Sequence, residues 1–474
     1  MGILDPQAVN RPKKKPPNKG MLKAIASYFQ FDYYQTNFRT EILAGITTFM
    51  TMAYILVVNP LILSDAIFLS EPRDLFAELV VATAVSAGIG TLIMGLLAKY
   101  PFAVAPGMGI NAFFAYSVVL GLSIDWQVAL ACVFVEGLVF ILLTITDLRR
   151  HLITAVPSSI KLATTAGIGL FLAYIGLGGT TETGGAGLIV ANEVTKTDFG
   201  SLAQPQTLMA IFGIFLTALF MVRRIKGALL WGIVGTALLG WAFGVAAAPQ
   251  GIASIPAFPQ NLFGAAIKGL GSIGNSWIDF IAVLLVFLFV DIFDTIGTLA
   301  GVGMQAGYID RNGELPRANQ ALTADAVATT TGAVLGTSSV TTFVESASGV
   351  AEGGRTGFTA VIVALLFFVS LIFTPIFEAI PAFATTPALT IVGVLMMASI
   401  VSIDWEDLTE AIPAFLTIFF IPFAFSIAAG LSVGLIAYPL LKTFAGKAED
   451  VPVITWILAA IFVARFVFMT LRFG

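Results

Sequence analysis

The segment GTSSVTTFVESASGVAEGG, Gly336–Gly354, lies in a strongly apolar chain but lacks the pattern of a continuous membrane-spanning helix. Its first part, Thr337–Phe343, is rich in β-branched and hydroxyl-bearing side chains, which favours a short strand. The residues that follow, Val344–Glu352, are mostly small and predict a short helix. The segment therefore predicts a membrane span that is interrupted part-way, with a strand followed by a half-helix.

A second segment, KYPFAVAPGMGINAFFAY (Lys99–Tyr116), has a similar organisation. Pro101 and Pro106 prevent a continuous helix, so we expect Phe102–Ala105 to be extended and a helix to begin after Pro106. Non-helical backbone is tolerated at membrane depth only where protein buries it or a cavity hydrates it. Two such half-helices would each present unpaired N–H groups and a partial positive charge at their N-termini. The pair predicts a polar site inside the membrane.

Composition places the rest of the chain in a membrane. Of the 474 residues, 58% are hydrophobic and 11% are charged, against roughly 25% charged in an average soluble domain. Stretches long enough to span a bilayer number about fourteen. They lie at about 41–60, 75–98, 102–121, 128–146, 155–178, 207–222, 227–248, 277–302, 318–335, 337–352, 356–378, 384–402, 409–428 and 429–444. A last apolar stretch, about 452–471, can be a span or an interfacial helix, and an even count favours the interface.

The distribution of Lys and Arg sets the orientation. With residues 1–36 as a basic, flexible cytoplasmic tail, alternate loops carry the basic excess that is typical of the inner side. These residues are Lys99, Arg149, Arg150, Arg223, Arg224, Lys226, Arg311, Arg317, Arg355, Lys442 and Lys447. The acidic loop Asp404–Asp407 is the exception. We therefore expect a multi-pass protein of the cell (plasma or inner) membrane with both termini in the cytoplasm.

Each broken segment is expected to be the third span of a group of seven. Because each half has an odd number of spans, the halves have opposite topology, which is typical of transporters built from inverted repeats. The predicted fold class is an all-α polytopic membrane protein with about 14 transmembrane segments in 7+7 inverted repeats. Short strands and half-helices interrupt spans 3 and 10. A small external hairpin is predicted within about 179–206.

Ionisable side chains inside spans are costly and mark functional sites by default. Asp291 and Asp294 are three residues apart, so they share one helix face, and one of two carboxyl groups this close should hold a proton. Glu345 opens the second half-helix, and Asn111 lies just inside the first. Structural alternatives stay open for all four: an Asp that caps a broken segment or pairs with Lys161, a Glu that only faces a helix dipole, and an Asn that bonds between helices.

Other residues carry less information. Glu136 and Asp325 also lie in spans and are compatible with packing or network roles, and His151 is expected in an interfacial loop. The single cysteine, Cys132, provides neither a disulfide nor a Cys-based metal site. The sequence has no P-loop and no HExxH motif, and its net charge of −4 gives no sign of nucleic-acid binding. We expect no enzyme activity, no cofactor and no metal.

Four segments in order resemble the AzgA-like purine permeases, a branch of the nucleobase–ascorbate transporter superfamily. They are NFRTEILAGITTFMTMAYILVVNP (Asn37–Pro60), PFAVAPGMGINAFFAY (Pro101–Tyr116), FVDIFDTIGTLAGV (Phe289–Val302) and TSSVTTFVESASGVAEGGRTG (Thr337–Gly357). The resemblance implies a core domain, residues 37–150 and 277–380, and a gate domain, residues 151–276 and 381–474. It also implies proton symport of adenine, guanine or hypoxanthine, and a homodimer formed through the gate domain.

By the same resemblance, Asp291, Asp294, Glu345 and Asn111 match the residues that bind substrate and couple it to the proton. We expect Glu345 and Asp291 to contact the base, backbone donors near Ser346 to complete the site, and Phe343 or Phe113 to stack on the base. Asp294 would relay the proton, together with Asp291 and Glu345. We expect a proton as coupling ion, although the residues alone do not exclude Na⁺. Other substrates on the same fold (uracil, xanthine, ascorbate or a small anion) and a membrane receptor or enzyme remain the alternatives.

Overall fold

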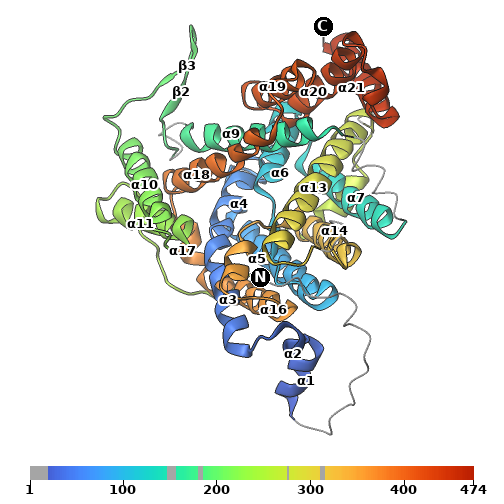
Figure 1. Cartoon of the computed structure of the whole chain (residues 1–474). Helices are drawn as coiled ribbons and strands as arrows, with labels where there is room; N and C mark the ends of the chain where they lie inside the picture. The colour runs from blue at the N-terminus through green and yellow to red at the C-terminus, as the bar shows by residue number, and fades with distance from the viewer. Residues whose placement is uncertain (1–19, 147–155, 180–184, 275–276, 310–314, 474) are drawn as a thin grey trace.

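The computed structural model describes residues 20–146, 156–179, 185–274, 277–309 and 315–473. Apart from two small sheets, the regular elements in these ranges are helices (Figure 1). Nine of the described helices are long and apolar enough to cross a membrane by length and composition. The remaining expected spans are shorter, broken or less apolar, because they carry Pro, Gly and hydroxyl side chains.

The expected spans correspond to helices in chain order. The first seven are α3 (Phe38–Met52) with α4 (Ile55–Ser64), α5 (Phe76–Ile93) with η2 (Met94–Ala98), β1 (Val104–Pro106) with α6 (Met108–Ala112) and η3 (Phe113–Gly121), α7 (Trp126–Ile145), α9 (Ser158–Leu177), α10 (Pro205–Val222) and α11 (Ala228–Ala242). The second seven are α13 (Trp277–Gln305), α14 (Ala318–Leu335), β4 (Val340–Thr342) with α15 (Ser346–Ala351), α16 (Gly357–Ser370) with α17 (Thr374–Ala379), α18 (Thr386–Met397), α19 (Leu408–Phe423) and α20 (Ile427–Phe444).

The two interrupted segments meet at the centre of the molecule, as the sequence predicts. β1 pairs with β4 in antiparallel register, with Val104 opposite Thr342 and Pro106 opposite Val340. Backbone hydrogen bonds extend the pairing at both ends, from Gly107 N to Ser339 O (3.0 Å) and from Phe343 N to Ala103 O (2.9 Å). The strand is shorter than the expected Thr337–Phe343 because only this stretch lies beside β1.

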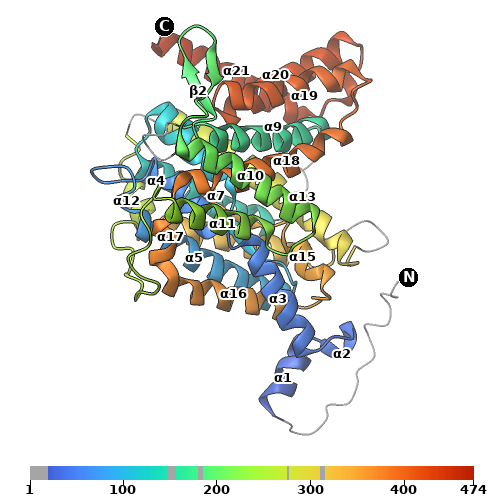
Figure 2. The same ribbon diagram turned by 90° about the vertical axis from the view of Figure 1, so that its left-hand side faces the viewer.

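The helices pack in two groups (Figures 1 and 2). In one group α3, α5, α7, α13, α14 and α16 pack against one another, and in the other α9 packs on α18, α19 and α20 while α10 packs on α11 and α18. These groups draw their helices from the residue ranges of the expected core and gate domains, respectively. The two broken segments belong to the first group, where β1 lies against α5 and β4 against α13 and α14.

Residues 20–36, the described part of the predicted flexible tail, form two short helices. Residues 1–19 lie outside the described residues, but α1 (Met21–Tyr28) and α2 (Phe31–Tyr34) dock on the first helix group. The Tyr28 hydroxyl donates to Leu96 O at 2.9 Å, and the Lys99 ammonium lies 4.1 Å from the Tyr28 ring centroid. Phe31 also contacts Phe358 at the start of α16. Aromatic packing therefore fixes a segment whose charge alone indicated a tail.

Three smaller elements complete the fold. The hairpin within 179–206 is present, formed by β2 (Ile189–Asn192) and β3 (Lys196–Phe199). A short helix, α12 (Ala265–Leu270), packs on α7. The last apolar stretch forms one helix, α21 (Val453–Phe473), which packs on α20.

Small residues allow the closest approach in the second group. A Cβ atom added at Gly393 of α18 would lie 2.5 Å from the carbonyl oxygen of Gly169 in α9. A Cβ added at Gly169 would in turn lie 2.8 Å from the carbonyl oxygen of Gly393. Helices in membranes associate through such small-residue contacts.

We therefore expect Gly393→Ala to force α9 and α18 apart and to destabilise the protein by about 1–3 kcal/mol. The measurement is the apparent melting temperature of the purified protein in detergent. Gly301→Ala in α13 is the matched control, because nothing lies within 4 Å of its added Cβ. Equal melting temperatures for the two variants would contradict the close approach.

Candidate functional site

Two half-buried carboxyl groups lie beside the tip of the second half-helix. Glu345 is the N-cap residue of α15, and one of its oxygens, Oε1, accepts a hydrogen bond from the buried Tyr54 hydroxyl at 2.7 Å. Asp294 of α13 contacts the hydroxyl of Thr341 in β4 and lies within electrostatic range of Glu345. Both carboxyl side chains are partly exposed. The structure therefore brings together Asp294 and Glu345, two of the expected site residues, at an accessible place.

The short strand positions these groups because its side chains alternate in direction. Thr341 faces α13, where its hydroxyl lies 2.7 Å from the hydroxyl of Thr295. Thr342 points the other way and donates to Asp325 Oδ1 of α14 at 2.9 Å, while Thr295 donates to Asp325 Oδ2 at 2.7 Å. The hydroxyl-rich pattern that indicated a strand therefore supplies the donors that hold a buried acid.

Asp291 lies deeper than the sequence analysis expected. It is completely buried, whereas Asp294, three residues later, is partly exposed. Three residues advance a helix by about 4.5 Å and leave the two side chains about 60° apart around its axis. The Asp291 carboxyl faces Thr329 of α14 and Glu136 of α7. In this structure, then, Asp291 belongs to a buried network behind the accessible carboxyl groups.

Asn111 joins a second buried network. Its amide nitrogen donates to Asn59 Oδ1 at 2.8 Å, and the Asn59 amide donates to Thr83 at 2.7 Å and to Thr337 at 2.9 Å. This arrangement is the interhelical bonding that the sequence left open for Asn111. Its Oδ1 atom is buried and has no hydrogen-bond partner among the described residues.

Ser346 and Phe343 hold the half-helix in place. The Ser346 hydroxyl accepts from Ala103 N at 2.9 Å, and Ser346 N donates to Phe343 O at 3.2 Å. Phe343 is buried, and so is Phe113, which contacts Phe287 edge-on at a centroid distance of 5.0 Å. The backbone donor at Ser346 and both candidate stacking rings are therefore engaged with protein in this structure.

Two residues of these networks were not singled out from the sequence. Tyr54 and Asn59 lie in the first span, and the only available signal was a polar side chain in an otherwise apolar run. Glu136 was noted as a residue within a span, but periodicity alone does not say which helix it faces. Its partner, Ser339, donates to Glu136 Oε2 at 2.9 Å from the segment just before β4.

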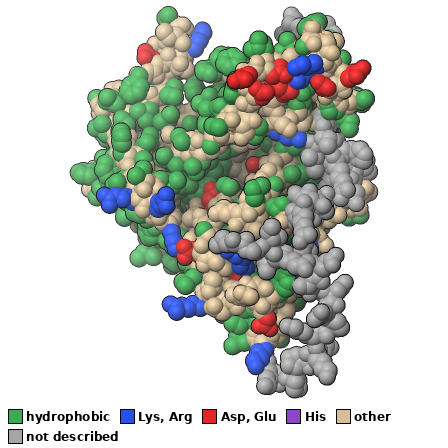
Figure 3. Space-filling model, in the orientation of Figure 1, with side chains coloured by type: hydrophobic (Ala, Val, Ile, Leu, Met, Phe, Trp, Pro, Cys, Tyr) green, Lys and Arg blue, Asp and Glu red, His purple; other side chains and the backbone are tan. Residues whose placement is uncertain are grey.

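One face of the molecule is hollowed. Figure 3 shows a depression near the centre of one face, with hydrophobic walls and acidic atoms in and beside it. A separate cavity of about 660 Å³ lies between the two helix groups near the hairpin, lined in part by Asp65, Tyr116, Tyr174 and Phe425. There Tyr116 donates to Asp65 Oδ2 at 2.8 Å. Neither Glu345 nor Asp294 lines this cavity, so we take the accessible carboxyl groups, and not this cavity, as the candidate site.

Two interrupted spans that pair inside an apolar helical protein, with carboxyl groups beside them, are typical of an integral membrane transporter. Residues 39–432 match the model of the permease family, and the chain belongs to this family. It is therefore a multi-pass membrane transport protein, and the predicted resemblance is confirmed.

Several relatives match over nearly their whole length. A putative permease of Methanocaldococcus jannaschii is 49% identical, covering 95% of this chain and all of the relative. The guanine/hypoxanthine permease PbuG of Bacillus subtilis is 43% identical over 94% of this chain and all of its own length. The adenine permease AdeP of Escherichia coli is 40% identical over 95% of this chain and 97% of its own length.

Solved structures support the fold. The transmembrane domain of the cyanobacterial bicarbonate transporter BicA superimposes with a TM-score of 0.58 at 17% identity, over 84% of this chain and 97% of that domain. The structure of SLC26A9 superimposes with a TM-score of 0.59 at 11% identity, over 92% of this chain and 73% of its own length. At these identities the likeness concerns the fold alone, and it confirms the predicted class of seven-plus-seven inverted repeats.

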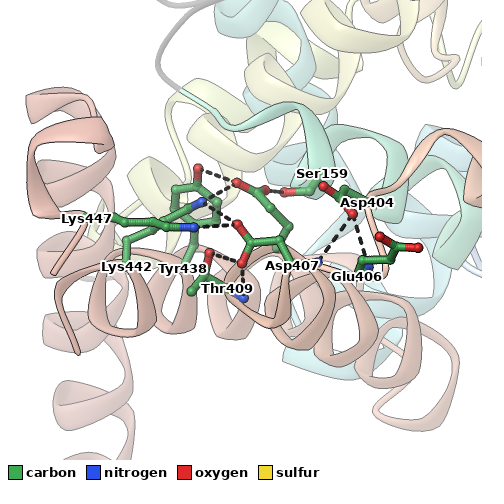
Figure 4. Close-up of polar contacts among 9 residues, drawn as sticks. Ser159, Asp404, Glu406, Asp407, Thr409, Tyr438, Lys442 and Lys447 are labelled. Atoms are coloured by element: carbon green, nitrogen blue, oxygen red, sulfur yellow. Dashed lines mark hydrogen bonds and ion pairs between the residues drawn. The ribbon is translucent and has the colours of Figure 1, made fainter. Parts of the chain in front are cut away.

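A charged cluster in the second helix group explains the acidic loop that broke the Lys and Arg pattern. Asp407 caps α19 through Thr409 N at 2.9 Å and accepts from Lys447 at 2.9 Å (Figure 4). Glu410 pairs with the nearly buried Lys442 at 2.7 Å and accepts from Ser159 and Tyr438. The cluster therefore ties together the ends of α9, α19 and α20.

Hydrogen bonds from Thr409 and the charge of Lys447 hold the pKa of Asp407 well below its usual range. A lowered pKa in the folded state stabilises the protein above the ordinary Asp value, and this contribution is lost as the pH falls through the folded pKa. Asp407→Asn should therefore lower the melting temperature at pH 7, with a difference from wild type that shrinks below about pH 4. Exposed Glu406→Gln is the control. A constant difference at every pH would refute this electrostatic origin.

Proposed function

We propose that this protein imports purine nucleobases (adenine, guanine and hypoxanthine) by proton symport. The observation that carries the proposal is the pair of partly exposed carboxyl groups, Glu345 and Asp294, at the tip of α15. A flat heterocycle with several N–H groups fits acceptors of this kind. The relatives named as guanine/hypoxanthine and adenine permeases, which match nearly the whole chain, support the same substrate class.

Glu345 is suited to bind the base. Tyr54 already donates to its Oε1, which fixes the orientation of the carboxyl group and leaves Oε2 to accept from a substrate. An ionised carboxylate accepts two adjacent N–H groups, such as those of guanine, whereas adenine presents one donor beside one acceptor and suits a protonated acid. The unpartnered Oδ1 of Asn111 is a further acceptor of the first half-helix.

The other candidate residues take supporting roles in this proposal. Asp294, next to Glu345, relays the coupling proton, and Asp291 contributes from the buried network behind it. Ser346 and Phe343 keep the tip of α15 in place through Ala103. Binding a proton removes a carboxylate charge, so the loaded site crosses the apolar barrier at a lower cost.

Transport then requires the core domain, residues 37–150 and 277–380, to move against the gate domain, residues 151–276 and 381–474. We place both termini in the cytoplasm and expect the gate domains to form a homodimer. The carboxyl groups at the site disfavour a small anion electrostatically, which makes this alternative the weaker one despite the shared fold.

Replacing the carboxylate of Glu345 should lower the rate of hypoxanthine uptake. Hydrogen bonds to a charged group contribute about 1.5–3 kcal/mol, so we expect Glu345→Gln to weaken hypoxanthine uptake by roughly 10- to 100-fold. The measurement is the initial rate of radiolabelled hypoxanthine uptake at several concentrations and pH values in cells without purine transport of their own. Glu352→Gln, at the other end of α15 and paired with Lys226, is the matched control. Normal, pH-driven uptake by Glu345→Gln would refute the assignment.

Substrate class is tested by competition. We expect an excess of unlabelled adenine, guanine or hypoxanthine to abolish uptake of labelled hypoxanthine, because each presents a planar N–H edge to the carboxyl groups. Uracil, xanthine, ascorbate and bicarbonate should compete poorly. If uracil, ascorbate or bicarbonate inhibits as strongly as hypoxanthine itself, the purine assignment is wrong. Equally strong inhibition by xanthine would contradict the narrower assignment to adenine, guanine and hypoxanthine.

A further inference from the structure

Two carboxyl groups lie buried behind the paired strands, apart from the accessible carboxyl groups of Glu345 and Asp294. Glu136 of α7 and Asp291 of α13 are both completely buried, and their carboxyl groups interact directly with each other. Ser339 donates to Glu136 Oε2 at 2.9 Å. The other oxygen of Glu136, Oε1, has no hydrogen-bond partner among the described residues, and neither has Oδ1 of Asp291.

The other carboxyl oxygen of Asp291, Oδ2, also lacks a good hydrogen-bond donor. The Thr329 hydroxyl lies 3.4 Å from Asp291 Oδ2 but 2.9 Å from the carbonyl oxygen of Val340. A hydroxyl has one proton to donate, and the shorter contact takes it. Asp325, on the same helix as Thr329, is different, because hydroxyl donors satisfy both of its oxygens. Among the completely buried acids Glu136, Asp291 and Asp325, only Glu136 and Asp291 therefore lack donors.

The surroundings of the pair are acidic. Asp325 of α14 lies within electrostatic range of both Glu136 and Asp291, and Asp294 of α13 lies within electrostatic range of Asp291. Helix α12 also packs on α7, but its Lys268 is exposed at the surface. No ion pair found in the described part of the chain includes any of these acids. Two ionised carboxylates would repel each other here, whereas one proton between them removes a charge and supplies the missing donor.

A metal ion fits the pair less well than a proton does. Within the described ranges no group of three or more His, Cys, Asp or Glu side chains has an arrangement that could hold a metal ion. Each member of the pair has one oxygen without a hydrogen-bond donor among the described residues, and a single proton held between the two carboxyl groups would supply a donor that neither has now.

We propose that Glu136 and Asp291 share the transported proton, as a carboxyl pair separate from the base-binding carboxyl group of Glu345. This inference rests on the proposed proton symport and adds Glu136 to it as a coupling residue. The pair gains one proton on the outer side, which reduces its charge from −2 to −1, and releases the proton on the inner side.

Ser339 connects the pair to both half-helices. Its hydroxyl donates to Glu136, and its carbonyl oxygen accepts from Gly107 N, directly before α6. Ser339 also directly precedes β4, which leads to Glu345. A protonated Glu136 is a weaker acceptor than an ionised one, so binding of the proton loosens the segment that positions the site.

The test uses the purified protein in proteoliposomes, with hypoxanthine as probe. Glu136→Gln keeps the size of the side chain, accepts from Ser339 and donates to Asp291, but it cannot bind a proton. We expect hypoxanthine binding and counterflow to stay within about threefold of wild type, while accumulation driven by a pH gradient falls by at least about tenfold. Proton uptake on addition of hypoxanthine, followed with a pH-sensitive dye, should disappear.

Ser339→Ala provides a second, milder variant. It removes the donor that favours ionised Glu136, so the midpoint of the pH profile of uptake should move to higher pH. Glu352→Gln is the control for both variants and should leave the profile and the proton uptake unchanged. If Glu136→Gln does not fold, the shift caused by Ser339→Ala decides the question, and an unmoved profile overturns the proposal.

The outcomes separate this inference from the proposed function. Wild-type protein that does not bind hypoxanthine would refute the function itself. Wild-type protein that accumulates hypoxanthine with a pH gradient, together with Glu136→Gln that does so equally well and with the same proton uptake, would refute only the pair. Accumulation by the wild type that needs a Na⁺ gradient and ignores the pH gradient would also overturn it.

Discussion

The pairing of β1 with β4 is the interaction on which the rest of the structure depends. A chain that leaves the helix at membrane depth exposes N–H and C=O groups that lipid cannot satisfy. Here the two interruptions satisfy each other, because Val104–Pro106 and Val340–Thr342 run antiparallel and are extended by bonds at Gly107 and Phe343. Neither break is stable without the other, so the two halves of the chain must meet at this point.

The same pairing explains why acids gather there. An extended segment turns alternate side chains in opposite directions, and the hydroxyl groups beside β4 reach α13 on one side and α14 on the other. Hydroxyl groups donate hydrogen bonds to both carboxyl oxygens of Asp325 and to one oxygen of Glu136. Asp291 has only one long contact with a hydroxyl group. Glu345 is held instead by Tyr54 and remains accessible. In the mechanism that we propose, the acid with a full set of donors is structural, the acids that lack donors bind the proton, and the accessible acid binds the substrate.

Sequence reasoning located both breaks, since Pro101, Pro106 and the hydroxyl-rich run 337–343 are local signals. It also placed Asp291, Asp294 and Glu345 near the breaks. It could not rank them by depth, because helical spacing gives a shared face but not the small rotation that buries Asp291 and exposes Asp294. The partners of Glu136 and Asn111, and the docking of α1 through Tyr28, depend on contacts between segments far apart in the chain, which no local pattern records.

The central claim is that a purine base binds between the accessible carboxyl groups at the tip of the second half-helix. An experimental structure determined with hypoxanthine present tests it most directly. The account predicts the base within hydrogen-bonding distance of the Glu345 carboxyl group, next to Asp294. A base bound elsewhere, such as in the cavity lined by Asp65 and Tyr116, with Glu345 turned away from it, would contradict the account.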